Sequence, residues 1–141
     1  MKILIPIDGS GPSLAALAAF VDRREWFRGP LALTLVHAHP ALPYKRAVAW
    51  AGKEAVQRYY DEESDQALAG ARTLLDERGV ACTVDKRVGD PAEEIVACAL
   101  AGNFELVVMG THGHTALVNL VMGSVATKVL AASKVPVLFM K

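Results

Sequence analysis

Residues 105–124 read E-L-V-V-M-G-T-H-G-H-T-A-L-V-N-L-V-M-G-S, and this stretch decides the fold of the chain. After one glutamate it begins with an apolar run, which predicts a buried strand at 105–109. A loop that contains Gly110 and Gly113 follows, and Gly123 and Ser124 lead into the next helical pattern. A buried strand, a glycine-containing loop and a helix in this order are typical of a parallel α/β sheet.

The rest of the chain repeats this alternation of short apolar runs and longer amphipathic ones. The other predicted strands lie at 2–7, 31–36, 82–88 and 135–140. Helical patterns lie between the strands, at 12–21, at 51–78, between Asp90 and Gly102, and at 124–132. Strands that alternate with helices indicate β-α-β crossovers, so we predict an α/β fold with a mostly parallel sheet and helices on both faces.

Some details of these elements follow from single residues. Ser10 and Asp90 are candidate N-caps, and a proline follows each within the first turn. Gly79 is placed to end the long helix at its C-terminus. The run at 82–88 alternates polar and apolar residues, which predicts an edge strand. The stretch at 39–49 contains two prolines and predicts an irregular loop before the long helix.

Length and composition limit the class of protein. The chain has 141 residues, which suits a single domain over 1–141. Fifteen basic residues balance fifteen acidic ones, so the net charge of zero argues against a nucleic-acid partner. No apolar run reaches the roughly 18–20 residues of a membrane helix, and no signal peptide is present, so we expect no membrane partner and a cytoplasmic location. Cys82 and Cys98 lie far apart without a C-x-x-C pattern, which predicts free thiols.

In an open parallel sheet, ligands bind beyond the carboxyl ends of the strands. The residues that follow the predicted strands are therefore the candidates for a binding site: Asp8-Gly9-Ser10, His37-Ala38-His39, Gly89-Asp90 and Gly110-Thr111-His112-Gly113. The glycines let backbone N–H groups approach an anion, and Gly123 and Ser124 lie at a helix N-terminus that favours phosphate. The alternative is that the glycines only form turns and caps, and spacing alone does not separate the two interpretations.

Other phosphate-binding signatures are absent from the sequence. No G-x-x-x-x-G-K-[ST] pattern exists, which excludes a Walker P-loop. The G-x-G-x-x-G pattern fails after the first strand because position 14 is Leu14. The pairs His37/His39 and His112/His114 could converge on a transition metal. The alternative is that His37 and His39 satisfy local backbone groups and that His112 and His114 line the phosphate loop, and we predict no metal site. Glu62, Glu63 and Asp65 predict a solvated face of the long helix.

The spacing Gly110-x-x-Gly113, nine residues, then Gly123-Ser124 resembles the nucleotide motif of the universal stress protein family. Three further segments are similar to that family in the same order along the chain: I-P-I-D-G-S at 5–10, G-D-P-A-E-E-I at 89–95 and V-P-V-L at 135–138. The resemblance implies an open five-stranded parallel sheet in the order 3-2-1-4-5, Rossmann-like and similar to adenine nucleotide alpha hydrolases.

The resemblance also implies a function. It implies an ATP-binding protein of the stress response that is regulatory, with at most slow ATP hydrolysis or autophosphorylation, and a homodimer formed through the last strand, from Val135 to Met140. ADP and AMP are alternative ligands, and Mg²⁺ is an accompanying ion. The site residues carried over from the motif are Pro6, Ile7, Asp8, Val36, Gly110, His112, Gly113, Gly123, Ser124 and Val125.

The roles implied for these residues follow their order along the chain. Pro6, Ile7 and Asp8 would line the nucleoside end, with Asp8 accepting hydrogen bonds from the base or ribose, and Val36 would offer backbone groups to adenine. Gly110, His112 and Gly113 would flank the ribose and phosphates, and residues 123–125 would hold the phosphates. For Asp8, the alternative is a turn-forming carboxylate before a helix.

One departure from the family pattern keeps other functions open. Family members with this loop commonly carry Lys or Arg between the second and third glycines, whereas residues 114–122 here contain neither, and Lys128 lies one turn inside the helix. This favours AMP or ADP over ATP, and it also favours a dimeric interaction protein of the same fold that has lost nucleotide binding. An adenylate-transferring enzyme is a third reading, but the H-x-G-H signature of such enzymes is absent after the first strand.

Overall fold

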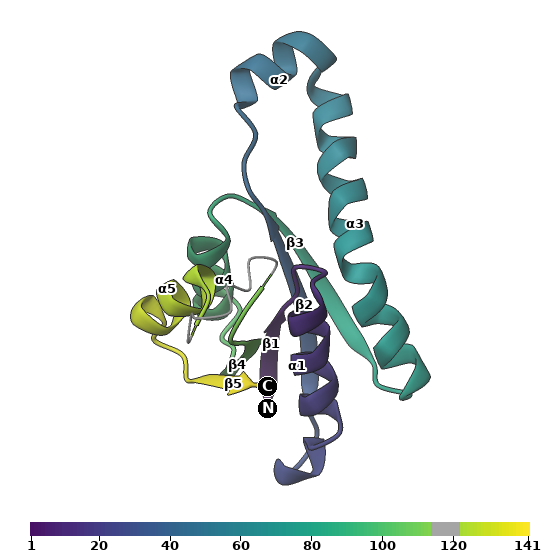
Figure 1. Ribbon diagram of the computed structural model, residues 1–141, viewed down its shortest axis with the longest axis vertical. Coiled ribbons are helices and arrows are strands. Elements are labelled where there is room, and N and C mark those ends of the chain that lie inside the picture. The colour runs from purple at the N-terminus through teal and green to yellow at the C-terminus, as the bar shows by residue number, and fades with distance from the viewer. Residues whose placement is uncertain (114–121) are drawn as a thin grey trace.

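The computed structural model describes residues 1–113 and 122–141, and its strands form one parallel sheet in the order β3-β2-β1-β4-β5 (Figure 1). The predicted α/β fold and strand order are therefore confirmed. The strands are β1 (Lys2–Pro6), β2 (Ala32–His39), β3 (Cys82–Val88), β4 (Leu106–Gly110) and β5 (Val137–Met140). β3 lies at one edge of the sheet, as its alternating sequence predicts.

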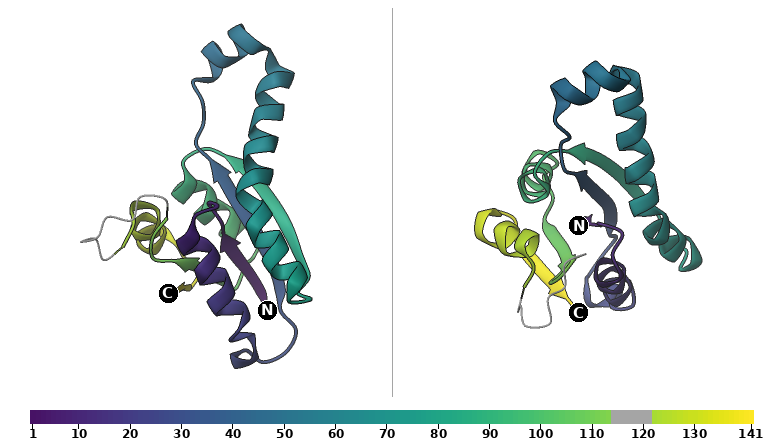
Figure 2. Two further views of the ribbon diagram at one scale, coloured as in Figure 1. Left: turned by 45° about the vertical axis from the view of Figure 1, so that its right-hand side comes forward. Right: turned by 45° about the horizontal axis from the view of Figure 1, so that its top comes forward.

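Helices cover both faces of the sheet (Figures 1 and 2). On one face, α1 (Gly11–Val21) and α3 (Lys53–Glu77) pack on the apolar side chains of Ile3 and Ile5. On the other, α4 (Pro91–Ala101) and α5 (Ser124–Ala132) pack on Leu4. Because successive side chains of a strand point to opposite faces, the continuous apolar run of β1 supplies both halves of the core.

The predicted capping residues act as expected. The Ser10 hydroxyl accepts a hydrogen bond from the Ser13 backbone N–H at 3.2 Å, which begins α1. Asp90 Oδ1 accepts from the N–H groups of Ala92 and Glu93 at 3.0 and 3.1 Å, which begins α4. Gly79 adopts the left-handed conformation (φ 61°) just beyond α3, where glycine is favoured. These caps fix where the loops at the carboxyl edge of the sheet turn into helices.

The prediction of an irregular loop at 39–49 before one long helix is wrong. β2 continues to His39, and α2 (Tyr44–Ala51) follows it. A short 3-10 turn, η1 (Arg24–Trp26), lies earlier in the chain, between α1 and β2. Pro43 occupies the N-cap of α2, where the missing N–H of proline costs nothing, and the Ala, Lys and Arg of this segment are good helix formers. Gly52 (φ 83°) separates α2 from α3.

We call residues 44–60 the arm. It comprises α2 and the first part of α3, and it projects away from the sheet (Figures 1 and 2). The Leu42 backbone N–H donates a hydrogen bond to the Tyr60 hydroxyl at 2.8 Å, which ties the segment before the arm to α3. The later part of α3 therefore covers the sheet, whereas its first part belongs to the arm.

Leu68 anchors α3 on the sheet and is fully buried in the core. Replacing Leu68 by Ala leaves a cavity, so we expect the free energy of unfolding to fall by about 2–5 kcal/mol in urea titrations. Gln66→Ala, at an exposed position of the same helix, is the control and should change stability by less than about 0.5 kcal/mol. Equal effects of the two substitutions would contradict this packing of α3.

The charge of Asp90 stabilises the start of α4 in a pH-dependent way. Its pKa is lowered from 3.8 by the hydrogen bond from the Glu93 N–H and by its contact with Lys128, so the stabilisation is lost as pH falls below that value. Asp90→Asn keeps a capping oxygen but removes the charge. We expect the stability difference between the wild type and this variant in urea titrations to be clear at about pH 7 and to shrink toward about pH 3. The same difference at both pH values would refute this role of the charge.

Candidate functional site

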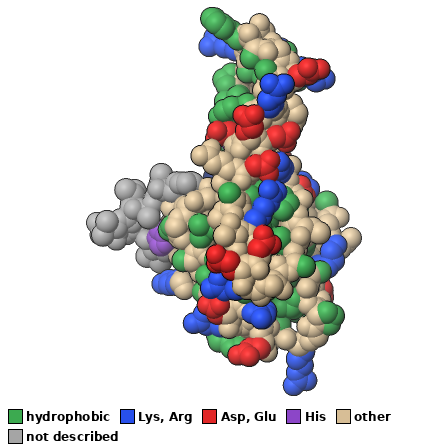
Figure 3. All heavy atoms as spheres, turned by 90° about the vertical axis from the view of Figure 1, so that its right-hand side faces the viewer, with side chains coloured by type: hydrophobic (Ala, Val, Ile, Leu, Met, Phe, Trp, Pro, Cys, Tyr) green, Lys and Arg blue, Asp and Glu red, His purple; other side chains and the backbone are tan. Residues whose placement is uncertain are grey.

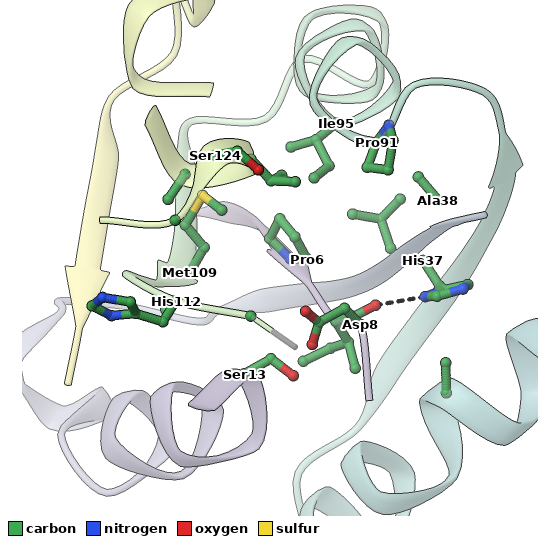
Figure 4. Close-up of a pocket in the computed structure, with 18 of the residues that line it drawn as sticks. Pro6, Asp8, Ser13, His37, Ala38, Pro91, Ile95, Met109, His112 and Ser124 are labelled. Carbon is green, nitrogen blue, oxygen red and sulfur yellow. Dashed lines mark hydrogen bonds between the residues drawn. The ribbon is translucent and has the colours of Figure 1, made fainter. Parts of the chain in front are cut away.

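A cavity of about 410 Å³ opens at the carboxyl edge of the sheet (Figure 4). This volume lies within the usual range for small-molecule sites. The cavity is bounded by the ends of β1, β2 and β4, by the starts of α4 and α5, and by the side of α3. All ten residues of the sequence-predicted site line it: Pro6, Ile7, Asp8, Val36, Gly110, His112, Gly113, Gly123, Ser124 and Val125.

One half of the pocket is apolar. Val36 and Met109 belong to the core that α4 and α5 cover, and Ile95 of α4 closes this half from above in Figure 4. Pro6, Ala38 and Pro91 complete the apolar wall. Such a slot is suited to a flat aromatic ring, which gains from apolar contact on its faces. The sequence analysis named Ala38 among the residues that follow the strands, but it missed Pro91, Ile95 and Met109.

The other half of the pocket is polar and faces α1 and α3. Along β2, His37 and His39 point to the opposite face from Val36, because side chains alternate across a strand. The buried His37 ring has its Nδ1 atom 2.7 Å from the carbonyl oxygen of Ile7. Since a carbonyl only accepts, Nδ1 carries the proton, and this bond ties the end of β2 to the loop after β1.

His39 joins this polar half to α3. Its Nδ1 lies 2.7 Å from the carbonyl oxygen of Pro40, its ring meets Tyr59 and Tyr60 edge-on, and its Nε2 lies 4.0 Å from Glu63. Both His37 and His39 thus satisfy local backbone groups, one of the two possibilities that the sequence left open. Glu62 and Asp65 are exposed as predicted, whereas the Glu63 side chain, which is 43% exposed, also lines the pocket.

The Asp8 carboxylate lies between the loops that follow β1 and β4. The Ser10 N–H donates to Asp8 Oδ1 at 2.9 Å, which is the turn-forming contact that the sequence suggested as an alternative. Asp8 Oδ2 approaches Gly113 so closely that a Cβ there would collide with it. A side chain at position 113 would therefore force this carboxylate to move from the wall of the pocket, where it lies between the two loops.

The loop after β4 also meets the start of α5. The Gly123 N–H donates to the Thr111 carbonyl oxygen at 2.7 Å, and the Thr111 hydroxyl lies 2.9 Å from His112 Nδ1. Gly123 is the N-cap of α5 and provides no side chain to cap it. The first N–H groups of α5 belong to Ser124, Val125 and Ala126, which all line the pocket. Such N–H groups and the helix dipole attract anions.

Permanent positive charge is sparse at this site. The described residues that line the pocket include no lysine or arginine. Lys128, one turn inside α5, has its Nζ atom 3.3 Å from Asp90 Oδ2, so its charge is paired with the cap of α4. His114 and the remainder of 114–121 lie outside the described residues. Within 1–113 and 122–141, no three His, Cys, Asp or Glu side chains are grouped to hold a metal ion.

The thiols are not placed for chemistry at this site. Cys98 is buried in α4, and burial together with the nearby Asp85 raises the pKa of its thiol to about 11. Cys82 lies in β3 with its pKa also raised, chiefly by burial. Neither lines the pocket. Both are free in the structure, in agreement with the sequence prediction.

Comparison with known proteins finds relatives of similar sequence and similar fold. The model of the universal stress protein family matches residues 1–141. Universal stress protein MJ0531 from Methanocaldococcus jannaschii is 35% identical over 141 residues, covering 99% of this chain and 81% of the relative. The solved structure of protein MJ0577 from the same organism superposes with a TM-score of 0.80 at 27% identity, covering 99% of this chain and 94% of that one.

More distant structures of the same fold contain nucleotides. A universal stress protein from Archaeoglobus fulgidus, 21% identical with a TM-score of 0.69, was solved with dAMP and covers 100% of this chain and 98% of that one. A family protein from Arabidopsis thaliana, 15% identical with a TM-score of 0.67, was solved with AMP and covers 100% of this chain and 91% of that one. With its sheet order, its glycine-lined pocket and a family match over its full length, the chain belongs to the universal stress protein family.

Proposed function

We propose that this protein binds an adenine nucleotide in the pocket at the carboxyl edge of its sheet. The observation that carries the proposal is the combination in one cavity of an apolar slot, the Asp8 carboxylate and the open N-terminus of α5. These three features correspond in chemistry to a base, a ribose and a phosphate. The presence of AMP and dAMP in two relatives of the same fold supports adenine as the base.

Each part of the nucleotide has its proposed partners. The base lies against Pro6, Ile7 and Val36, and Val36 offers backbone groups to its edge. Asp8 accepts from a ribose hydroxyl. The α-phosphate lies against Gly123 and is held by the N–H groups of Ser124 and Val125 and by the Ser124 hydroxyl, while Gly110, His112 and Gly113 flank the ribose and phosphates.

The number of phosphates is set by electrostatics. ATP, ADP and AMP all fit the proposed chemistry, and Mg²⁺ would neutralise part of the charge of a bound triphosphate. Because Lys128 is paired with Asp90, the β- and γ-phosphates of ATP gain little from this wall of the pocket. We therefore propose that the chain discriminates weakly between AMP, ADP and ATP.

We further propose a regulatory role in a stress response, in which the bound nucleotide biases a conformation or a partner contact. We place this activity in the cytoplasm, in one domain over 1–141. The proposed assembly is a homodimer through the last strand, since β5 is an edge strand that pairing would protect.

A dimeric interaction protein that has lost nucleotide binding is the second candidate function. The absence of lysine and arginine from the described pocket lining favours it. The two candidates differ in one observable, since only the first binds adenine nucleotides in equilibrium titrations.

Gly123→Val tests the proposed phosphate site. Gly123 has an ordinary φ of −71°, and a Cβ there would lie 3.5 Å from His112 Cα, so the fold tolerates a side chain that crowds the pocket. We expect affinity for ATP, ADP and AMP to fall at least about tenfold, because a charge-assisted hydrogen bond contributes roughly 1.5–3 kcal/mol. Ala131→Val, exposed on the same helix and outside the pocket, is the control and should keep wild-type affinity. Unchanged affinity of Gly123→Val would remove the phosphate assignment.

Native mass spectrometry of the purified protein tests assembly and ligand together. We expect a species of twice the 15.1-kDa chain mass that carries co-purified adenine nucleotide. A dimer without nucleotide that also fails to bind added AMP and ATP would support the second candidate function. A monomer at micromolar concentration would contradict the proposed dimer.

A further inference from the structure

Positive charge is concentrated on residues 44–58 of the arm, and we call these residues the tip. The tip carries four basic residues and one acidic residue, whereas the chain as a whole has a net charge of zero. The basic residues are Lys45, Arg46, Lys53 and Arg58, and the acidic one is Glu54. Figure 3 shows Lys and Arg side chains beside hydrophobic ones at this end of the molecule. The net charge of the chain therefore hides a local basic surface.

The tip also exposes aromatic side chains. Trp50 is 94% exposed and Tyr44 is 52% exposed, although large apolar side chains are usually covered. Arg46 and Trp50 are four residues apart on α2, so they share one face of the helix. In the part of the chain that the structure describes, no side-chain hydrogen bond or ion pair is made by Lys45, Arg46 or Lys53.

The helix α2 of the tip lacks the burial that normally stabilises a short helix. α2 has eight residues, all of them described, and none is buried. Helices shorter than about 12–15 residues are marginal in water unless tertiary packing supports them. A surface that holds α2 by its basic and aromatic side chains would supply that support.

Acidic residues next to the tip limit what this surface could be. Asp61, Glu62, Glu63 and Asp65 follow the tip along α3, toward the sheet. They would repel a nucleic acid that runs along the arm. They also offer little to the tip of a second copy of this chain, because Lys86 lies 2.8 Å from Asp65 and 3.9 Å from Asp61, and His39 lies near Glu63. A flat anionic surface that meets the end of the arm contacts the basic tip and stays away from these acidic residues. Such a surface also needs no acidic partner from a second copy of the chain.

We propose that the tip of the arm docks the protein on membranes that contain anionic phospholipids. Lysine and arginine attract the headgroup phosphates, and Trp and Tyr partition into the interface between headgroups and acyl chains. Such docking is peripheral, and among the described residues no helix is long and apolar enough to cross a bilayer. The expectation of no membrane partner was based on the lack of a spanning segment and of a signal peptide, and neither describes this local surface.

Vesicle co-sedimentation of the full chain tests the proposal. We expect binding to vesicles of phosphatidylcholine with about 30% phosphatidylglycerol, at least about fivefold weaker binding to pure phosphatidylcholine, and loss of binding near 0.5 M NaCl, where charges are screened. The chain has two tryptophans, so Trp26→Phe leaves Trp50 as the only tryptophan reporter. Its emission should shift to shorter wavelength with the anionic vesicles only. Equal binding to both vesicle types, or no binding to either, would overturn the proposal.

Reversing the charge of basic residues in the tip tests whether the tip is the surface that binds the vesicles. Lys45→Glu with Arg46→Glu should reduce binding to anionic vesicles at least about tenfold. Arg28→Glu with Lys134→Glu makes the same change in net charge at exposed positions outside the tip and should bind nearly as well as the wild type. Equal losses in the two double variants would show an effect of net charge alone and would overturn the assignment to the tip.

Trp50→Ala and Trp26→Ala test the aromatic contribution in the same way, since Trp26 is also exposed (69%) but lies outside the arm. Only Trp50→Ala should weaken vesicle binding, with unchanged circular dichroism and thermal midpoint. Two other results would contradict the proposal: binding of a DNA duplex that exceeds vesicle binding and is lost on reversal of Lys45 and Arg46, or a vesicle-independent oligomer that the same reversal dissociates.

Discussion

The close approach of the Asp8 carboxylate to the backbone at Gly113 is the contact on which the geometry of the pocket depends. β1 and β4 are parallel neighbours, so the loops that follow them leave the sheet at the same edge. A side chain at position 113 would displace this carboxylate from its place against the second loop. With Asp8 also held by the Ser10 N–H, the carboxylate is fixed between the two loops. The pocket is then closed on its third side by the start of α5.

Strand alternation divides this pocket into two chemically different halves. Val36 and Ala38 of β2 face the helices on one side of the sheet, whereas His37 and His39 face α3 on the other. A ligand that lies across the edge of the sheet therefore meets apolar groups on one side and carboxylates with imidazoles on the other. The helix α3 supplies Glu63 and Ala67 to the polar half and also carries the arm, so one helix connects the pocket with the proposed docking surface.

Much of this architecture could be predicted from the sequence, for identifiable reasons. The continuous apolar run of β1 and the strand, glycine loop and helix at 105–124 are local signals, and they correctly indicated a parallel sheet. The ten residues implied by the family resemblance all line the cavity at its carboxyl edge. The helix at 44–51 was predicted to be part of an irregular loop because the two prolines before it, Pro40 and Pro43, are typical of loops. In the structure, Pro43 lies at the N-cap of this helix. Pro91, Ile95 and Glu63 were missed as pocket residues because their places depend on how α4 and α3 pack, which local patterns do not encode. The pairing of Lys128 with Asp90 is likewise a long-range contact.

We propose that an adenine nucleotide lies across this edge of the sheet with its phosphate on the N-terminus of α5. The most direct measurement is a crystal structure of the protein grown with millimolar AMP and, separately, ATP. The account predicts density for the base between Pro6 and Val36, with phosphate oxygens about 3 Å from the N–H groups of Ser124 and Val125. A pocket that holds water alone at these concentrations, or is filled by side chains of the surrounding loops, would contradict it.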